Sequence, residues 1–144
     1  MRRSWQWAGV GFIGFGVLAV LSVMSGRGGT GIFLAILAVA YSVAFSPLPF
    51  PTSVTAAEAG ERAAADGMPI IYWRPGCQYC LRLRGRLGRR ARRAHWVNIW
   101  ADPDGAARVR AAADGCETVP TVVIRGTAHV NPDPAMVQRA ITTA

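Results

Sequence analysis

The sequence of 144 residues contains no lysine, three cysteines and two histidines. All 16 basic residues are therefore arginine, and they outnumber the 8 acidic residues to give a formal net charge of +8. Three cysteines cannot build the framework of several disulfides that holds small secreted proteins together. Hydrophobic residues make up 51% of the chain and the mean hydropathy is +0.24, which excludes a disordered or collagen-like chain.

Charge is almost absent from the amino-terminal part of the chain, where Arg27 is the only charged residue between Arg3 and Glu58. Two apolar runs, Ala8 to Met24 and Gly31 to Phe45, are joined by a turn-like sequence rich in glycine and serine. With its uncharged flanks, each run approaches the ~20 residues that a membrane-spanning helix needs. We therefore predict a hairpin of two transmembrane helices.

The predicted organisation has three parts: a transmembrane hairpin at 1–52 with helices at about 8–26 and 30–47, a linker helix at 53–67, and a domain at 68–144. The alternatives are a cleaved signal peptide followed by one anchor, or two helices buried in a soluble core. Arg2 and Arg3 flank the first helix at its amino end, whereas Arg27 stands alone at the other end. The positive-inside rule then predicts a multi-pass protein of the cell (inner) membrane with a cytosolic domain.

Helix and strand patterns alternate beyond residue 53, which indicates an α/β layer with a mixed four-stranded sheet and flanking helices. Thr55 and Glu58 form a capping box at the start of the first helix, and Asp102 with Pro103 opens a later one. The expected order is helix 55–67, strand 68–73, helix 77–94, strand 95–100, helix 102–115, strands 119–124 and 127–130, and helix 131–141.

The chemistry of the chain is expected at Cys77 and Cys80, which form a Cys-x-x-Cys between a predicted strand and a predicted helix. A cysteine at a helix amino terminus lies beside unpaired N–H groups and the positive end of the helix dipole, which favour its thiolate. Cys80 follows one turn later and could resolve a mixed disulfide formed at Cys77. Arg74 adds a positive charge beside the pair and could hold a carboxylate on a bound thiol.

Other functions for the cysteine pair stay open at this point. A zinc site would need two more ligands, for which Cys116, His95 and His129 are the candidates, but their spacing forms no second metal-binding motif. An iron–sulfur cluster shared across a dimer is another alternative. We expect no resident metal, a buried Cys116, and structural roles for both histidines.

A second signal is Thr118-Val119-Pro120, because a proline entering a strand removes a donor from the sheet. If the bond before Pro120 is cis, the backbone of Val119 could pair with a peptide-like ligand beside the cysteines. Read alone, such a proline more often belongs to an ordinary edge strand or turn.

The segment Tyr72-Trp-Arg-Pro-Gly-Cys-Gln-Tyr-Cys80, followed 38 residues later by Thr118-Val119-Pro120, resembles the glutaredoxin family of the thioredoxin superfamily. More narrowly it resembles the actinobacterial mycoredoxin-like proteins, and the resemblance covers about residues 68–142. It implies a thioredoxin-like fold and an oxidoreductase that reduces mixed disulfides or protein disulfides. Cys77 would be the nucleophile and Cys80 the resolving thiol, and the thiol-binding residues would be Arg74, Tyr79, Thr118, Val119 and a cis Pro120.

The sequence departs from the glutaredoxin pattern at two places. Gln78 replaces the proline common between the two cysteines, and Arg125-Gly126-Thr127 replaces the run that grips the γ-glutamyl end of glutathione. Mycothiol lacks that end, so we expect mycothiol rather than glutathione as the low-molecular-weight thiol co-substrate, with no tightly bound cofactor. The expected partners are the membrane and proteins that are disulfide-bonded or S-thiolated. The rival functions are a membrane-bound metal or iron–sulfur binding module, and an outward-facing enzyme that forms disulfides.

Arginines crowd the predicted helix after Cys80, at helical spacing that places several of them in one row. The row consists of Arg82, Arg86, Arg89 or Arg90, and Arg93. Attraction to anionic lipid, a solvated face, or steering of acidic substrates each accounts for such a row. A nucleic-acid groove is not expected, because no aromatic residues are interleaved with the arginines.

Overall fold

A computed structural model describes residues 2–45 and 50–144, with side chains described for residues 9–43 and 50–144. The chain divides into two compact units, Met1–Pro49 and Phe50–Ala144.

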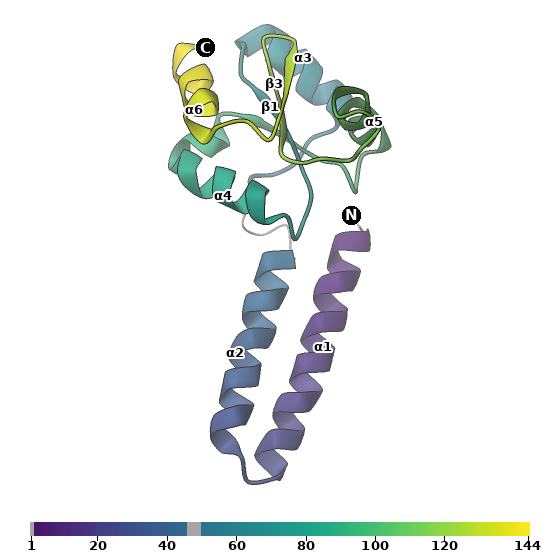
Figure 1. Ribbon diagram of the computed structural model, residues 1–144, viewed down its shortest axis with the longest axis vertical. Coiled ribbons are helices and arrows are strands. Elements are labelled where there is room, and N and C mark those ends of the chain that lie inside the picture. The colour runs from purple at the N-terminus through teal and green to yellow at the C-terminus, as the bar shows by residue number, and fades with distance from the viewer. Residues whose placement is uncertain (1, 46–49) are drawn as a thin grey trace. The chain divides into compact units, whose positions relative to one another are not determined.

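The first unit is a pair of neighbouring helices, α1 (Arg2–Met24) and α2 (Gly28–Phe45), joined by a turn at Gly26 (Figure 1). Glycine permits the close approach of the two helices. A methyl group at Gly11 would lie 2.0 Å from Cε1 of Tyr41, and one at Gly31 would lie 2.5 Å from Cγ2 of Val23. The predicted helical hairpin is therefore present, with its first helix starting earlier than residue 8 and its second starting at Gly28.

The membrane-spanning character expected of this hairpin is not supported. Within the part of the chain that the structure describes, neither helix combines the length and hydropathy needed to cross a membrane. The expected end of the second helix at residue 47 lies outside the described residues.

The second unit contains a four-stranded mixed sheet with helices on both faces, as the sequence predicts. Its strands are β1 (Ile70–Trp73), β2 (His95–Asn98), β3 (Thr121–Ile124) and β4 (Thr127–Val130), in the order β2-β1-β3-β4. Strand β1 runs parallel to β2 and antiparallel to β3, which is antiparallel to β4. In the register, Tyr72 lies between Val97 and Thr121.

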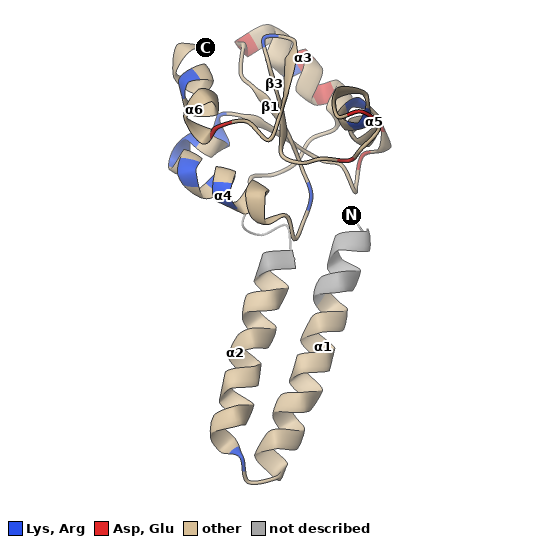
Figure 2. Ribbon diagram, in the orientation of Figure 1, with Lys and Arg blue, Asp and Glu red and all other residues tan. Residues whose placement is uncertain are grey.

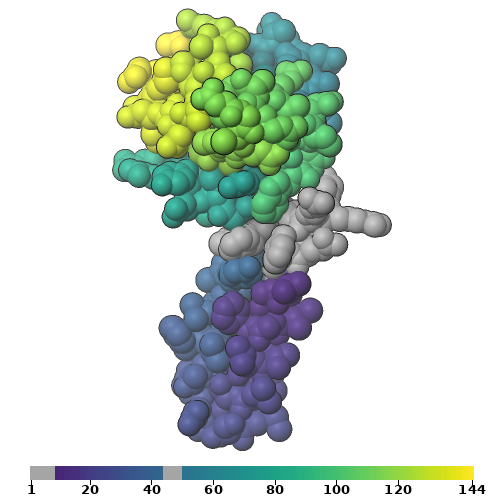
Figure 3. All heavy atoms as spheres, turned by 45° about the vertical axis from the view of Figure 1, so that its right-hand side comes forward, coloured from purple at the N-terminus to yellow at the C-terminus, as the bar shows by residue number. Residues whose placement is uncertain are grey.

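Four α-helices flank the sheet: α3 (Ala56–Asp66), α4 (Gln78–Leu87), α5 (Pro103–Ala112) and α6 (Pro134–Thr143). Helices α3 and α5 lie on one face, and α4 and α6 lie on the other (Figure 1). The space-filling view shows the yellow carboxy-terminal segment directly against the teal segment that contains α4 (Figure 3).

Helix α3, expected to be a linker, belongs to the core of the second unit, since Ala56 and Ala59 are fully buried. Its amino-terminal cap is Thr55, as predicted. Asp102 joins α3 to α5. One carboxylate oxygen accepts hydrogen bonds from the amides of Asp104 and Gly105, and the other accepts one from the amide of Ala56.

The first residues of the second unit contact the sheet through Phe50, Ser53 and Val54. The Phe50 ring stacks on the Trp73 indole with centroids 3.8 Å apart. The Trp73 Nε1–H donates to Ser53 Oγ at 2.9 Å, and the Val54 amide donates to the Trp96 carbonyl at 2.9 Å. The aromatic residues Tyr72, Trp73 and Trp96 are buried, and Trp100 is partly buried.

Several predicted element bounds are wrong. Strands β1 and β3 each begin two residues later than predicted, and α5 ends at Ala112 rather than at residue 115. The helix expected over 77–94 ends at Leu87, because Gly88 adopts a φ of +56° and a 3₁₀ helix, η1 (Gly88–Arg92), follows. The arginine row expected on that helix is therefore not continuous, although the shared apolar face of Leu83, Leu87, Ala91 and Ala94 is buried. The last helix begins at Pro134 rather than at residue 131, because Asp133 supplies its cap. Strand β2 ends at Asn98, two residues early.

Candidate active site

Cys77 is the amino-terminal cap residue of α4, which follows β1 after a three-residue loop. Gly76 in that loop has a φ of +75°, a conformation that favours glycine. Cys77 itself is extended, with φ −82° and ψ 107°, so its side chain turns back over the first turn of the helix. Its Sγ atom accepts a hydrogen bond from the Cys80 amide at 3.2 Å. The sulfur therefore takes the place that a serine or aspartate oxygen occupies in an ordinary cap.

The two sulfur atoms of the Cys-x-x-Cys lie together. The Cys80 thiol donates to Cys77 Sγ, and the two Sγ atoms are 2.6 Å apart. Cys80 is fully buried, whereas Cys77 keeps 9% of its surface exposed. An incoming disulfide can therefore reach only Cys77 without movement of the protein, and Cys80 is placed to attack Cys77 Sγ once that atom is part of a mixed disulfide.

The environment separates the acidities of these two thiols. The pKa of Cys77 is lowered to about 6, chiefly by the hydrogen bond from the Cys80 thiol. Burial opposes this shift, and the amides of Cys80 and Tyr79 and the charge of Arg74 reinforce it. The same hydrogen bond and burial raise the pKa of Cys80. At neutral pH the pair therefore consists of a Cys77 thiolate and a Cys80 thiol, which is the arrangement that nucleophilic attack by Cys77 requires.

The segment Thr118-Val119-Pro120 lies beside the cysteines, 42 residues away in sequence. Cys77 Sγ lies 3.4 Å from the Val119 carbonyl oxygen, to which the thiol donates when Cys77 is protonated, and the Val119–Pro120 peptide bond is cis. Val119 and Pro120 are buried, whereas Thr118 is exposed. The Thr118 carbonyl accepts a hydrogen bond from the Thr121 hydroxyl at 2.8 Å, which fixes the turn into β3.

Arg74 and Tyr79 are the two other residues that the sequence assigned to the site. Arg74 is partly buried and close enough for its charge to lower the pKa of both thiols. Tyr79 has 52% of its surface exposed at the first turn of α4, and its amide also stabilises the Cys77 thiolate. The structure therefore collects Arg74, Cys77, Tyr79, Cys80 and Val119 in one place.

The residues considered as additional metal ligands do not join the cysteine pair. His95 Nε2 lies 2.9 Å from an Asp66 carboxylate oxygen, in a hydrogen bond at the start of β2. Cys116 is exposed, so its predicted burial is wrong: it follows Gly115 in a loop after α5 that packs no side chain into the core. Among the described residues, no three side chains of His, Cys, Asp or Glu come together as a metal site.

One feature of the site escapes sequence reasoning. The Val119 carbonyl contacts Cys77 directly, whereas the sequence suggested only that its backbone faces a ligand. Every residue has a backbone carbonyl, so no residue type could have indicated this acceptor.

Residues 70–130 match the glutaredoxin family model. The match spans β1 to β4 and includes both cysteines and the Thr118-Val119-Pro120 turn. This part of the chain is a glutaredoxin-like domain with a thioredoxin-like fold, and the likeness supports a thiol–disulfide oxidoreductase type of function. No curated protein and no solved structure matches the chain.

Proposed function

We propose that the chain is a glutaredoxin-like thiol–disulfide oxidoreductase in which Cys77 is the nucleophile and Cys80 the resolving thiol. The observation that carries the proposal is the position of Cys77 at the start of α4. Its sulfur accepts hydrogen bonds from the amide and the thiol of Cys80 and keeps a small exposed surface. This is the polarised, partly accessible setting in which cysteines react.

In the monothiol route, the substrate is a mixed disulfide between a protein and a small thiol. The Cys77 thiolate attacks the sulfur of the small thiol, the substrate S–S bond breaks, and the protein leaves as a thiolate that takes a proton from solvent. A second small thiolate then attacks the small-thiol sulfur bonded to Cys77. This step releases the oxidised small-thiol dimer and regenerates the Cys77 thiolate, so each turnover consumes one free small thiol and passes the disulfide from the substrate to the dimer.

In the dithiol route, Cys77 attacks a protein disulfide and becomes linked to one of its sulfurs. Cys80 loses its proton and attacks Cys77 Sγ, so that the reduced protein leaves and a Cys77–Cys80 disulfide forms. Two small thiols restore the dithiol. The distance of 2.6 Å between the sulfurs supports this resolution step.

The small thiol we propose is mycothiol rather than glutathione, and this belongs with a mycoredoxin-like activity. After β3 the chain continues as Arg125-Gly126-Thr127, without the residues expected to hold a γ-glutamyl group. Arg74 would attract an anionic part of the thiol, Tyr79 would flank it, and the backbone at Thr118 to Pro120 would orient it. The client proteins would carry disulfides or S-thiolated cysteines.

The test is turnover of a mixed disulfide by the full chain with mycothiol or glutathione as reductant. We expect no turnover with Cys77→Ser, and retained monothiol turnover with Cys80→Ser. Cys116→Ser is the matched control, because it removes an exposed thiol outside the site and should leave activity unchanged. Absence of turnover with both thiols would refute the proposal. If the purified protein then retained iron or zinc, the metal-binding alternative would replace it.

We further propose that the first unit anchors the protein in the cell membrane, with the second unit in the cytosol. The support is a hairpin that carries no charge except Arg27 in its described side chains (Figure 2) and exposes many large apolar ones. The exposed set includes Val10, Phe12, Ile13, Val17, Leu18, Ile32, Phe33 and Ile36. In water such a surface is unfavourable, whereas lipid chains would cover it.

Membrane attachment and its orientation can be tested with one variant. Cys77→Ser/Cys80→Ser leaves Cys116 as the only thiol, and Cys116 is exposed. We expect the variant to remain with the membranes after alkaline carbonate washing. A membrane-impermeant maleimide should label it only after the cells are permeabilised. Labelling in intact cells would place the second unit outside the cytosol. Release of the protein by the carbonate wash would refute the proposed membrane anchor.

A further inference from the structure

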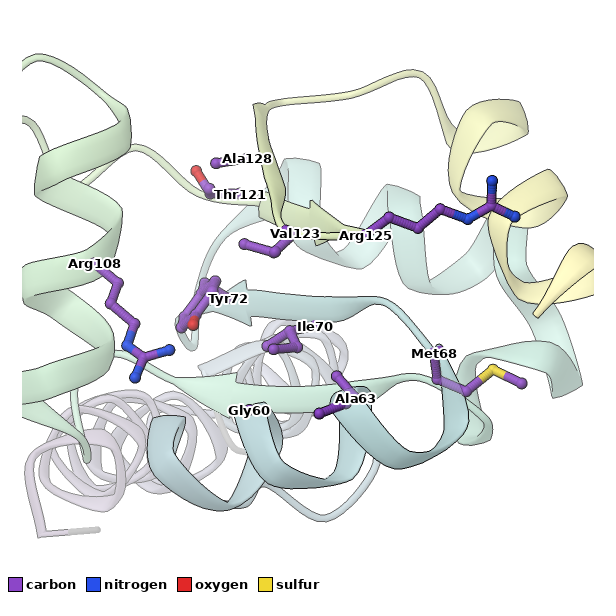
Figure 4. A pocket seen from close by; sticks show the side chains of 13 residues that line it. Gly60, Ala63, Met68, Ile70, Tyr72, Arg108, Thr121, Val123, Arg125 and Ala128 are labelled. Carbon is purple, nitrogen blue, oxygen red and sulfur yellow. The ribbon is translucent and has the colours of Figure 1, made fainter.

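A cavity of about 520 Å³ lies on the face of the sheet that α3 and α5 cover (Figure 4). Ile70 and Tyr72 of β1 and Val123 of β3 form one side, and Gly60 and Ala63 of α3 with Arg108 of α5 form the other. This volume falls within the range of sites that hold small molecules, and the lining is largely apolar. Cys77 begins α4, which packs on the opposite face of the sheet.

The cavity exists because α3 turns its smallest residues toward α5. A methyl group placed at Gly60 would meet no atom closer than Nη1 of Arg108, at 3.9 Å. The two helices are held together at their amino ends by the carboxylate of Asp102, and past that point no large side chain of α3 fills the space between them.

One positively charged group, the guanidinium of Arg108, lies beside this apolar space. Arg108 extends from α5 with its guanidinium close to the Tyr72 hydroxyl (Figure 4), while the Arg125 guanidinium points away toward the rim. None of the lining residues is acidic, and no described carboxylate forms an ion pair with Arg108. The nearby Asp102 carboxylate is already engaged by three backbone amides.

Tyr72 provides a hydrogen-bond donor at the same point. Its side chain is 1% exposed, and burial raises the pKa of its hydroxyl, with the charge of Arg108 acting in the opposite direction. The hydroxyl therefore keeps its proton at neutral pH. A guanidinium and a phenol hydroxyl beside an apolar cavity are complementary to a ligand that carries a carboxylate on an apolar group. The guanidinium pairs with the carboxylate, and the cavity removes the apolar group of the ligand from water.

We propose that this cavity binds a small monocarboxylate with an apolar body of about one ring, with its carboxylate on Arg108 and the Tyr72 hydroxyl. The site is separate from the cysteine pair, so its occupancy does not depend on the redox function proposed above.

The probe is 3-phenylpropionate, with neutral 3-phenylpropanamide as its matched control. Each is titrated into the isotope-labelled full chain while the backbone amide signals of Gly60, Ala63 and Ala128 are followed. We expect saturable shifts with the acid and a dissociation constant about tenfold higher or more for the amide, as for loss of a charge-assisted hydrogen bond. No saturable shift with the acid, or equal binding of acid and amide, would overturn the proposal.

Two variants locate the site, and two others are controls. Arg108→Gln should remove the preference for the acid, whereas Arg139→Gln, an exposed arginine on α6, should leave it intact. Ala63→Leu keeps a helix-forming residue in α3 and should block both probes by filling the cavity. Cys77→Ser should bind the acid like the parent protein. Acid binding that survives Arg108→Gln and Ala63→Leu unchanged would place the probe elsewhere and refute the site.

Discussion

A methyl group added to Gly105 would lie 2.8 Å from Cγ1 of Val97, closer than two carbon atoms can approach without movement. Gly105 is in the first turn of α5, and Val97 is a fully buried residue of β2. The absence of a side chain at this position therefore sets how closely α5 packs on the sheet.

Gly105→Ala should destabilise the second unit by about 1–2 kcal/mol, because overpacking outweighs the gain in helix propensity. The matched control is Gly85→Ala in α4, where an added methyl group meets no atom within 4 Å. It should stabilise the unit by about 0.5–1 kcal/mol. Denaturant unfolding followed by near-ultraviolet circular dichroism measures both. Equal shifts of the two midpoints would contradict the close approach to Val97.

Asp102→Ala should cost about 2 kcal/mol, because it removes the cap of α5 and the acceptor for the Ala56 amide of α3, and each of these contributes about 1 kcal/mol. Asp102→Asn keeps one acceptor oxygen and should lose less. Asp104→Ala is the control, since Asp104 is exposed in the same helix and has no cap role in the described hydrogen bonds. If Asp102→Ala and Asp104→Ala unfold at the same denaturant concentration, the shared cap does not stabilise the fold.

Phe50→Ala should destabilise the second unit by about 3 kcal/mol, the usual loss for a buried aromatic ring. Phe50 is 7% exposed and stacks on Trp73, which in turn lies next to the loop leading to Cys77. Phe33→Ala in α2 is the control, because its ring is 60% exposed and outside the second unit. An unchanged unfolding midpoint for Phe50→Ala would show that the segment before α3 is not part of the cooperative unit.

The alkylation rate of Cys77 by iodoacetamide should follow its thiolate fraction. Because the pKa of Cys77 is lowered to about 6, the rate should be constant above pH 7 and fall as the pH drops through 6. The hydrogen bond from Cys80 is the largest cause, so Cys80→Ala should move this inflection to higher pH. Both are measured in a Cys116→Ser background, which removes the exposed thiol. An inflection at the same pH with and without Cys80 would refute this cause.

The sequence predicts the site better than it predicts the element ends. Cys77 and Cys80 share one helical turn, so a Cys-x-x-Cys at a helix start specifies their proximity locally. Val119 reaches Cys77 only through the pairing of β1 with β3, which the strand order implies but no single residue indicates. The exposure of Cys116 was not predicted, because a loop conformation depends on tertiary packing rather than on residue hydrophobicity.

The end of α4 and the cavity are harder to predict from the sequence than the cysteine pair is. Gly88 could have continued the helical periodicity, and its positive φ is visible only in the folded chain. The cavity exists because the small side chains of α3 leave space between α3 and α5 unfilled. Alanine and glycine in a helix predict burial and helix formation, but they do not predict whether a neighbouring side chain fills the space beside them.

The break at Gly88 also changes how the arginines that follow Cys80 present their charge. Arg82 and Arg86 lie one turn apart on α4, whereas Arg89, Arg90 and Arg92 belong to a separate 3₁₀ helix with three residues per turn. Arginines divided between two helices repel one another less than they would in one continuous row. This division also widens the range of directions from which an anionic molecule is attracted. Association with acidic reactants should therefore slow as salt is added and should tolerate the loss of any single arginine.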